Sequence, residues 1–292
     1  MTLYQHPLAY VLGLEGLALL RAFAGEHDRE FTAARIAEIR ALLDRAAEFG
    51  DGYELEVVPP ERYYDRWSLT YDTEDNGIFG FQDELLLPIL DGLTPGVTVD
   101  AACGTGRNGK ALVARGHRVY GFDLSPGMLA RTRANVPGGF FARASLTALP
   151  LATGVADNVV CTLALSHLEH LEPFFAEAAR VLKPGGHLII SDTRGQFPLS
   201  RHYPLIRPDG YLRNWHHPVT AYLRAALDAG FLVRACEEPR RPGPTVPPGQ
   251  DAPPLDPAVP PTIWHLHPWV PDTADAARDA MPALIVWDFE LA

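Results

Sequence analysis

Cysteine, basic clusters and long apolar runs are scarce in this sequence of 292 residues, and each scarcity excludes a class of protein. The three cysteines, Cys103, Cys161 and Cys236, have no C-x-x-C or metal-type spacing, which is typical of a reduced cytosolic protein and predicts no metal site. No apolar run reaches the roughly 18 residues of a membrane span, and no basic start with a cleavage site marks a signal peptide. We therefore expect a cytoplasmic protein without membrane contact.

Positive charge is also in short supply. The chain has 25 Lys and Arg residues against 36 Asp and Glu residues, a formal net charge of −11, and it contains no run of basic residues. Binding to a nucleic-acid backbone requires a basic surface that neutralises phosphates. The composition therefore predicts a small-molecule substrate and no nucleic-acid partner.

The strongest pattern that is present is the glycine-rich segment 97–109, VTVDAACGTGRNG. A short apolar run ends at Asp100 and breaks into glycines at Gly104 and Gly106, which predicts a buried strand, a tight loop and a helix that begins near Arg107. Backbone N–H groups of such a loop can approach a ligand closely because no Cβ intervenes. The run GTGRNG also fits the dinucleotide template G-x-G-x-x-G, so two classes of nucleotide cofactor remain open at this point.

Two carboxylates near this loop bear on the choice between the cofactor classes. Asp100 closes the strand before the glycines, which suits a ligand that carries an amine rather than a phosphate. Asp123 ends the next predicted strand, 118–123, and is placed to bind a ribose diol. Both cofactor classes contain that diol, so Asp123 does not distinguish them.

Beyond the loop, short apolar strands alternate with helical segments. Strands are expected at 97–101, 118–123, 140–144, 158–163, 186–191, 231–238 and 283–291, and helices at 82–90, 107–115, 126–134, 171–182 and 218–229. This alternation predicts a parallel sheet that is covered by helices on both faces. Ligands of such sheets bind beyond the carboxyl ends of the strands, where Asp100, Asp123, Leu163 and Asp192 would gather.

Four motifs carry a resemblance to a known family. The stretches VDAACGTGRNG, GFDLSPGML, DNVVCTLALSHLEH and RVLKPGGHLIISD, in this order and spacing, resemble class I S-adenosylmethionine-dependent methyltransferases of the small-molecule type, similar to the ubiquinone-biosynthesis enzymes. The resemblance covers roughly residues 60–238. It implies an α/β, Rossmann-like sheet of seven mostly parallel strands with helices on both faces and an antiparallel last strand. It also implies S-adenosyl-L-methionine as cofactor and methyl transfer as the reaction.

The resemblance further implies which residues bind the cofactor. Besides Asp100 and Asp123, they are Tyr71, Ala102, Gly104, Gly106, Leu124, Met128, Ser145, Leu146 and Leu163. The segment with Tyr64 and Trp67 resembles the lid of this enzyme type, where aromatic faces would stabilise a sulfonium cation, unless these side chains only pack the lid. Ser145 departs from the family pattern, which usually has an acidic residue there. A serine hydroxyl accepts a hydrogen bond from an adenine amino group more weakly.

Three residues are candidates for catalysis or acceptor binding: His167, His216 and Asp192. By resemblance, His167 lies beside the cofactor and could act as a base, or it could only bond the helix that follows. His216, in the aromatic and cationic run 211–218, could line an aromatic substrate or merely precede a helix. Asp192 could orient a histidine or bind an amine of the substrate.

Residues outside the region of resemblance predict additional structure. Segments 8–23 and 31–49 have helical apolar spacing, and 8–23 is apolar on nearly all sides, which predicts burial against another element. These helices could cover the main domain, cap the substrate or form a homodimer contact. A proline-dense stretch toward the C-terminus should follow an extended surface path. We therefore predict an N-terminal helical extension or cap, 1–60, and a methyltransferase domain, 61–292, with a proline-rich insertion at 239–271.

The sequence as a whole predicts methyl transfer to a small aromatic or heteroaromatic metabolite, at an O, N or C atom, of the kind made in natural product biosynthesis. Two alternatives stay open. One is a protein of this fold that binds the cofactor without transferring methyl, such as a cyclase or an interaction subunit. The other is an NAD(P)-dependent oxidoreductase, which is disfavoured because no Tyr-x-x-x-Lys pair or comparable hydride site is present.

Overall fold

The computed structural model describes residues 2–72, 78–194, 200–207, 210–279 and 281–292. The chain forms two compact units. The first, called here the N-terminal unit, comprises Met1–Val58, Pro204–Arg213 and Arg240–Pro282. The second, called here the sheet unit, comprises Pro59–Tyr203, Asn214–Pro239 and Ala283–Ala292.

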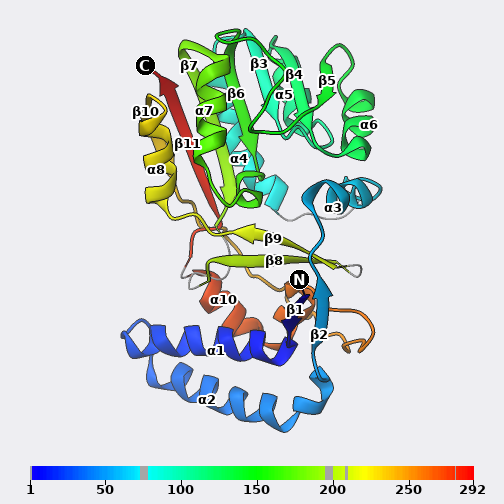
Figure 1. The fold of residues 1–292 in the computed structure, drawn as a ribbon. Helices are drawn as coiled ribbons and strands as arrows, with labels where there is room; N and C mark the ends of the chain where they lie inside the picture. The colour runs from blue at the N-terminus through cyan, green and yellow to red at the C-terminus, as the bar shows by residue number, and fades with distance from the viewer. Residues whose placement is uncertain (1, 73–77, 195–199, 208–209, 280) are drawn as a thin grey trace. The chain divides into compact units, whose positions relative to one another are not determined.

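The sheet unit contains a seven-stranded sheet within the described residues (Figure 1). Its strands are β3 (Val97–Ala101), β4 (Arg118–Asp123), β5 (Phe140–Arg143), β6 (Ala156–Thr162), β7 (Leu182–Thr193), β10 (Phe231–Glu237) and β11 (Leu284–Leu291). Their order is β10-β11-β7-β6-β3-β4-β5. Strands β5, β4, β3, β6 and β7 run parallel, whereas β11 is antiparallel to both β7 and β10. The predicted fold class is therefore confirmed, including the antiparallel last strand.

Helices cover both faces of this sheet because the strands carry apolar side chains on both (Figure 1). Along β7, Leu188 and Ile190 belong to one apolar cluster and Ile189 to another, as expected for side chains that alternate between faces. The first cluster includes Phe175 of α7 (Glu172–Val181) and side chains of α8 (Val219–Asp228). The second includes Leu86 of α4 (Ile78–Gly92) and side chains of α5 (Arg107–Ala114) and α6 (Pro126–Asn135).

In the N-terminal unit, α1 (Pro7–Phe23) and α2 (Arg29–Asp44) share a core with α9 (Ile263–Leu266) and α10 (Pro271–Asp279). The buried stripe of α1 includes Val11 and Leu14, which pack in a cluster with Trp269. The predicted burial of this helix against other elements is thus found along one stripe, while Leu20 and Phe23 are exposed. Neither α1 nor any other helix in the described ranges has the length and apolarity needed to cross a bilayer.

Four short strands form two ribbons that the sequence pattern did not predict. β1 (Thr2–Gln5) pairs antiparallel with β2 (Tyr53–Glu56), and β8 (His202–Arg207) pairs with β9 (Gly210–Trp215). The predicted helix at 31–49 is also divided, because α2 is followed by the 3-10 helix η1 (Ala46–Phe49). The proline-dense segment groups with the N-terminal helices in one unit. The roles of 1–60 as a cap or a dimer contact stay predictions.

Candidate active site

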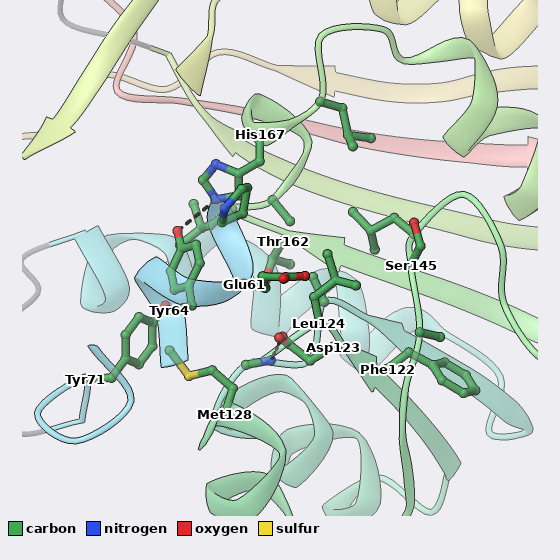
Figure 2. Close-up of a pocket in the computed structure, with 18 residues that line it drawn as sticks. Glu61, Tyr64, Tyr71, Phe122, Asp123, Leu124, Met128, Ser145, Thr162 and His167 are labelled. Carbon is green, nitrogen blue, oxygen red and sulfur yellow. Dashed lines mark hydrogen bonds between the residues drawn. The ribbon is translucent and has the colours of Figure 1, made fainter. Parts of the chain in front are cut away.

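A pocket opens at the carboxyl ends of the parallel strands in the sheet unit (Figure 2). It contains about 800 Å³ of empty space, counting its open mouth. Helix α3 (Pro60–Trp67), the loops after β3 to β6, and the 3-10 turn η2 (Leu165–His167) supply its wall. The lining residues are Pro60, Glu61, Tyr64, Tyr71, Ala102, Gly104, Phe122, Asp123, Leu124, Met128, Ala144, Ser145, Leu146, Thr162, Leu163, Ala164, His167 and Leu168.

The loop after β3 presents mainly backbone to the pocket. Ala102 and Gly104 line it with φ angles of 60° and 52°, a left-handed backbone that favours glycine. A Cβ added to Gly104 would meet nothing within 4 Å, so the glycine leaves an open cradle. Gly106 does not line the pocket; a Cβ there would lie 2.7 Å from Val136 Cγ2. Gly106 therefore lets the loop pack against the end of α6, while Gly104 keeps space for a ligand.

Asp123 holds this loop from the end of β4. Its Oδ2 accepts a hydrogen bond from the Gly104 N–H at 2.9 Å (Figure 2). Its Oδ1 accepts one from the Ser125 N–H at 2.9 Å. Burial raises the pKa of Asp123, and the backbone hydrogen bonds from Ser125 and Gly104 oppose that shift. Since the carboxylate also lines the pocket, Asp123 both shapes the cradle and offers acceptor oxygens to a ligand.

Asp100 lies outside the pocket wall, at the end of β3. Its side chain is fully buried, and neither carboxylate oxygen has a hydrogen-bond partner among the described residues. Burial raises the pKa of Asp100 to about 7, and the charge of nearby Asp123 adds to this shift. An unpartnered buried carboxylate is costly, and a cationic amine bound nearby would offset the cost.

We expect Asp100→Asn to stabilise the protein at pH 8 and to change its stability little at pH 4. The folded-state pKa of about 7 lies above the ordinary value of 3.8, so the folded state binds the proton more tightly. Stability that is present below pH 4 is therefore lost as the pH rises toward 7. At about 1.4 kcal/mol per pH unit, the loss at pH 8 is on the order of 4 kcal/mol. Thermal unfolding of both proteins at the two pH values tests this, and an equal difference at both would contradict it.

The end of the pocket opposite Tyr71 is largely apolar (Figure 2). Phe122 and Leu124 lie at this end (Figure 2), and the pocket wall also includes the apolar side chains of Met128, Ala144 and Leu146. Ser145 adds a hydroxyl, which lies 3.0 Å from Thr147 Oγ1 and accepts a hydrogen bond from the Thr147 N–H at 3.2 Å. Leu163, with a φ of 55°, brings another strained backbone to the wall. A slot of this kind suits a flat aromatic base with one weak polar contact.

At its other end the pocket contains a pair of side chains, His167 and Tyr64 (Figure 2). His167 Nε2 and Tyr64 Oη are 2.8 Å apart. Burial lowers the pKa of His167 to about 4, which a side-chain interaction with Asn214 partly offsets. Burial likewise raises the pKa of Tyr64 well above its ordinary value. At neutral pH the imidazole is therefore uncharged and the phenol protonated, so the imidazole can still take up a proton.

Asp65 fastens α3, the helix that carries Tyr64, to the N-terminus of α6. Asp65 Oδ1 accepts hydrogen bonds from the Gly127 N–H at 2.7 Å and from Ser125 Oγ at 3.2 Å. The Tyr64 ring also stacks on Trp67, with 5.8 Å between the ring centroids. These contacts hold Tyr64 in place as part of the pocket wall.

We expect Gly127→Ala to loosen α3 from α6. The added Cβ would overlap Ser68 Oγ and lie 3.0 Å from the Asp65 carbonyl oxygen, which cannot rotate away. A loss of about 1–3 kcal/mol in unfolding free energy follows from such overpacking. Gly80→Ala in α4 is the matched control, because its Cβ would meet nothing within 4 Å and should be neutral or slightly stabilising. Thermal unfolding compares the two, and equal midpoints would contradict this account.

Two predicted catalytic residues lie outside the pocket wall. Asp192 is buried near the end of β7, where its Oδ2 accepts a hydrogen bond from the Ser166 N–H at 2.6 Å. It thereby supports the turn η2, which also carries His167. His216 follows β9 and donates its backbone N–H to the Arg201 carbonyl oxygen at 2.9 Å. The direct roles predicted for Asp192 and His216 stay predictions.

Other lining residues were not singled out by the sequence. Glu61 stands at the start of α3 and forms an exposed ion pair of 3.4 Å with Arg143. The Thr162 hydroxyl accepts a hydrogen bond from Asn108 Nδ2 at 2.7 Å. No local pattern marks either residue; only the nearby aromatic segment around Tyr64 hinted that α3 contributes to the site. Among the described residues, no group of three or more His, Cys, Asp or Glu side chains could hold a metal ion.

The combination of this sheet, a glycine loop after β3 and an acid at the end of β4 defines an enzyme that binds a nucleoside cofactor at the carboxyl edge of its sheet. Comparison with known proteins identifies which cofactor. A family model described as a methyltransferase domain matches residues 99–190. A structure of an S-adenosylmethionine-dependent methyltransferase from Mesorhizobium loti shares the fold, with a TM-score of 0.52 and 23% identity over 71% of this chain and 97% of that one.

Two curated relatives carry the same assignment. An uncharacterized methyltransferase of Emericella nidulans is 28% identical over 231 residues, which are 63% of this chain and 79% of that protein. A malonyl-[acyl-carrier protein] O-methyltransferase of Methylovorus is 32% identical over 197 residues, 63% of this chain and 65% of that protein. Residues 99–190 therefore match a methyltransferase domain, and the likenesses support an S-adenosylmethionine-dependent methyltransferase with S-adenosylmethionine as its cofactor.

The open space and the polar groups of the pocket suit this cofactor. The open cradle at Gly104 admits a ligand against the backbone, and Asp123 offers oxygens for hydroxyl groups. Asp100 is buried outside the pocket wall, so its predicted contact with the amine of the cofactor stays a prediction. The apolar slot around Phe122 suits an adenine ring. The residues present therefore fit S-adenosylmethionine.

Proposed function

We propose that this methyltransferase acts on a small, uncharged aromatic or heteroaromatic acceptor, at an O, N or C atom. The charge of the pocket supports this most directly. Among the described lining residues, the acids are Glu61 and Asp123, and none is Lys or Arg. A carboxylate acceptor would meet like charge without a cation to pair with, which is costly where water is excluded. The aromatic rings of Tyr64 and Tyr71 favour a flat acceptor.

When bound, the cofactor supplies a methyl group on a positively charged sulfur. The residues of the chain hold the acceptor in line with that methyl group and exclude water, and good positioning contributes roughly 7–11 kcal/mol in favourable cases. The faces of Tyr64 and Tyr71 can stabilise a nearby cation. An O–H or N–H acceptor must also lose a proton. His167, uncharged at neutral pH, is a side chain of the wall that can receive it.

The first test is cofactor binding by calorimetry. We expect the purified chain to bind S-adenosylmethionine with a dissociation constant in the micromolar range, about 8 kcal/mol of binding free energy. The absence of a binding signal at millimolar cofactor would remove the proposal.

The second test is an acceptor screen with S-adenosylmethionine that carries a labelled methyl group. The panel contains phenols, catechols, pyridines and indoles in one arm and aliphatic dicarboxylic acids in the other. We expect label in products of the aromatic arm. Transfer confined to the dicarboxylic acids would contradict the proposed substrate class. Binding of the cofactor without transfer to either arm would favour a protein of this fold that does not transfer methyl.

A further inference from the structure

A second carboxylate besides Asp123 lines the pocket. Glu61 stands in the first turn of α3, and its Oε2 accepts a hydrogen bond from Arg143 Nη2 at 3.4 Å. The side chains of this ion pair are both half exposed, 50% for Glu61 and 57% for Arg143. An ion pair that is so exposed to water contributes little, so it holds Glu61 only weakly. Arg143 itself is not a lining residue, and the Glu61 carboxylate is therefore available to a ligand.

Glu61 lies between the two ends of the pocket. Tyr64, which follows three residues later on the same face of α3, marks the end with the imidazole. Arg143, the ion-pair partner of Glu61, ends β5 two residues before Ser145 of the apolar slot. Figure 2 shows Glu61 near the centre of the view, as it does Asp123. In S-adenosylmethionine the ribose joins the base to the sulfur, so a cofactor whose base fills the slot has its sugar in this middle part.

The chemistry of a carboxylate narrows what Glu61 can contact there. A bound cofactor displaces water from Glu61, and a carboxylate that loses water without gaining a hydrogen-bond donor is costly. The two ribose hydroxyls are donors. Asp123 also faces the sugar, but both of its oxygens already accept a hydrogen bond from a backbone N–H at 2.9 Å. Part of its capacity to accept is therefore used, and a second acid can bind the second hydroxyl.

We propose that Glu61 binds the cofactor by accepting a hydrogen bond from one ribose hydroxyl, while Asp123 accepts one from the other. The inference rests on S-adenosylmethionine as cofactor and is independent of the methyl acceptor. The ion pair with Arg143 opens when the carboxylate turns to the sugar. The arrangement also selects the ligand: a phosphate on either hydroxyl would meet two carboxylates, and no lining residue in the described ranges is Lys or Arg.

Calorimetry on the full chain measures the contact. The main probe is S-adenosylhomocysteine, the cofactor without its methyl group, because its sulfur carries no charge that could attract Glu61. We expect Glu61→Ala to weaken its binding about tenfold, and Glu61→Gln to weaken it less, since an amide oxygen accepts without charge. S-adenosylmethionine should lose the same factor. A loss confined to S-adenosylmethionine would overturn the proposal, because Glu61 would then act on the sulfonium charge and not on the sugar.

Two analogues of S-adenosylhomocysteine test the sugar directly, one without the 2′-hydroxyl and one without the 3′-hydroxyl. In the wild-type protein each should bind about tenfold more weakly than the parent ligand. One of them should lose nothing further in Glu61→Ala, because the substitution and the missing hydroxyl remove the same hydrogen bond. The other analogue should lose another factor of about ten. If Glu61→Ala weakens the binding of both analogues as much as that of the parent, Glu61 does not contact the sugar.

Two further variants separate a ligand contact from a structural role. Arg143→Ala removes the ion pair but not the carboxylate, so the affinity for S-adenosylhomocysteine should stay within about threefold. A loss equal to that of Glu61→Ala would overturn the proposal, because the pair would then act by holding α3. Asp91→Ala is the matched control. Asp91 is 64% exposed, pairs with Arg115 at 2.7 Å and does not line the pocket, so its replacement should leave the affinity unchanged.

The failure of this inference and that of the proposed function can be told apart. A wild-type protein that binds neither S-adenosylmethionine nor S-adenosylhomocysteine would overturn both. Binding that is unaffected by Glu61→Ala would overturn only the role of Glu61 and leave the methyltransferase assignment intact.

Discussion

Replacing Asp123 by Ala should weaken S-adenosylmethionine binding by more than tenfold while leaving the protein folded. Its two carboxylate oxygens hold the N–H groups of Gly104 and Ser125, and the same carboxylate faces the pocket. The variant therefore loses a hydrogen-bond acceptor for the hydroxyl groups of the cofactor. It also loses the carboxylate that anchors the loop at Gly104. Charge-assisted hydrogen bonds contribute about 1.5–3 kcal/mol each, which corresponds to a factor of ten or more. Calorimetry measures the dissociation constant.

Asp157→Ala is the matched control for this prediction. Asp157 also binds a backbone N–H, that of Val97 at 2.7 Å, but it does not line the pocket. We expect Asp157→Ala to lower the unfolding temperature and to leave the affinity for S-adenosylmethionine within about twofold, since no contact in the pocket changes. An unchanged affinity in Asp123→Ala would mean that the ribose is held elsewhere.

His167→Gln should reduce methyl transfer to an O–H or N–H acceptor by about 100-fold to 10,000-fold, the range that proton-transfer catalysis usually supplies. The substitution keeps a polar side chain beside Tyr64 but removes the nitrogen that can take up a proton. Cofactor affinity should change little, because the glycine cradle and Asp123 remain intact. Single-turnover rates with a labelled methyl group, together with calorimetry, separate these two effects.

His117→Gln is the control for the loss of a buried histidine as such. His117 is buried at the amino end of β4, where its Nδ1 lies 2.8 Å from Thr98 Oγ1, and it does not line the pocket. Its replacement should cost stability without lowering the rate of transfer. If His167→Gln retains the full rate with a phenol, then His167 is structural and the acceptor loses its proton by another path.

Much of the sheet unit could be predicted from sequence because its signals are local. Alternating apolar strands and helices predicted a parallel sheet, the family resemblance implied its seven strands, and the acids at the ends of β3 and β4 predicted its functional edge. The positions of Gly104 and Asp123 in the pocket wall follow from the same pattern. The environment of the Asp100 side chain could not be predicted in this way. The end of a strand can be predicted, but whether its side chain enters the pocket or turns into the core depends on packing around it.

Contacts between distant segments could not be predicted in this way. The sequence pattern treated the proline-dense segment as an insertion in the methyltransferase domain, whereas Trp269 and its neighbours complete the core of the N-terminal helices. The apolar periodicity of a segment predicts that one side of it is buried, but it does not predict which other segment covers that side. The sequence likewise singled out His167 and, in a separate segment, Tyr64, but it gave no signal that the two side chains would lie 2.8 Å apart.

The sequence by itself predicted a glycine loop between a strand and a helix, because the backbone freedom of such a loop is encoded residue by residue. The loop left two cofactor classes open, and the resemblance of four motifs to class I methyltransferases implied which one. The sequence also determined the order of strands and helices that places this loop at the edge of the sheet. Only the tertiary structure decided the chemistry beside the cofactor. Tyr64 and His167 are 103 positions apart, and the packing of α3 against α6 brings them within 2.8 Å. The burial that keeps His167 uncharged also exists only once these elements have packed.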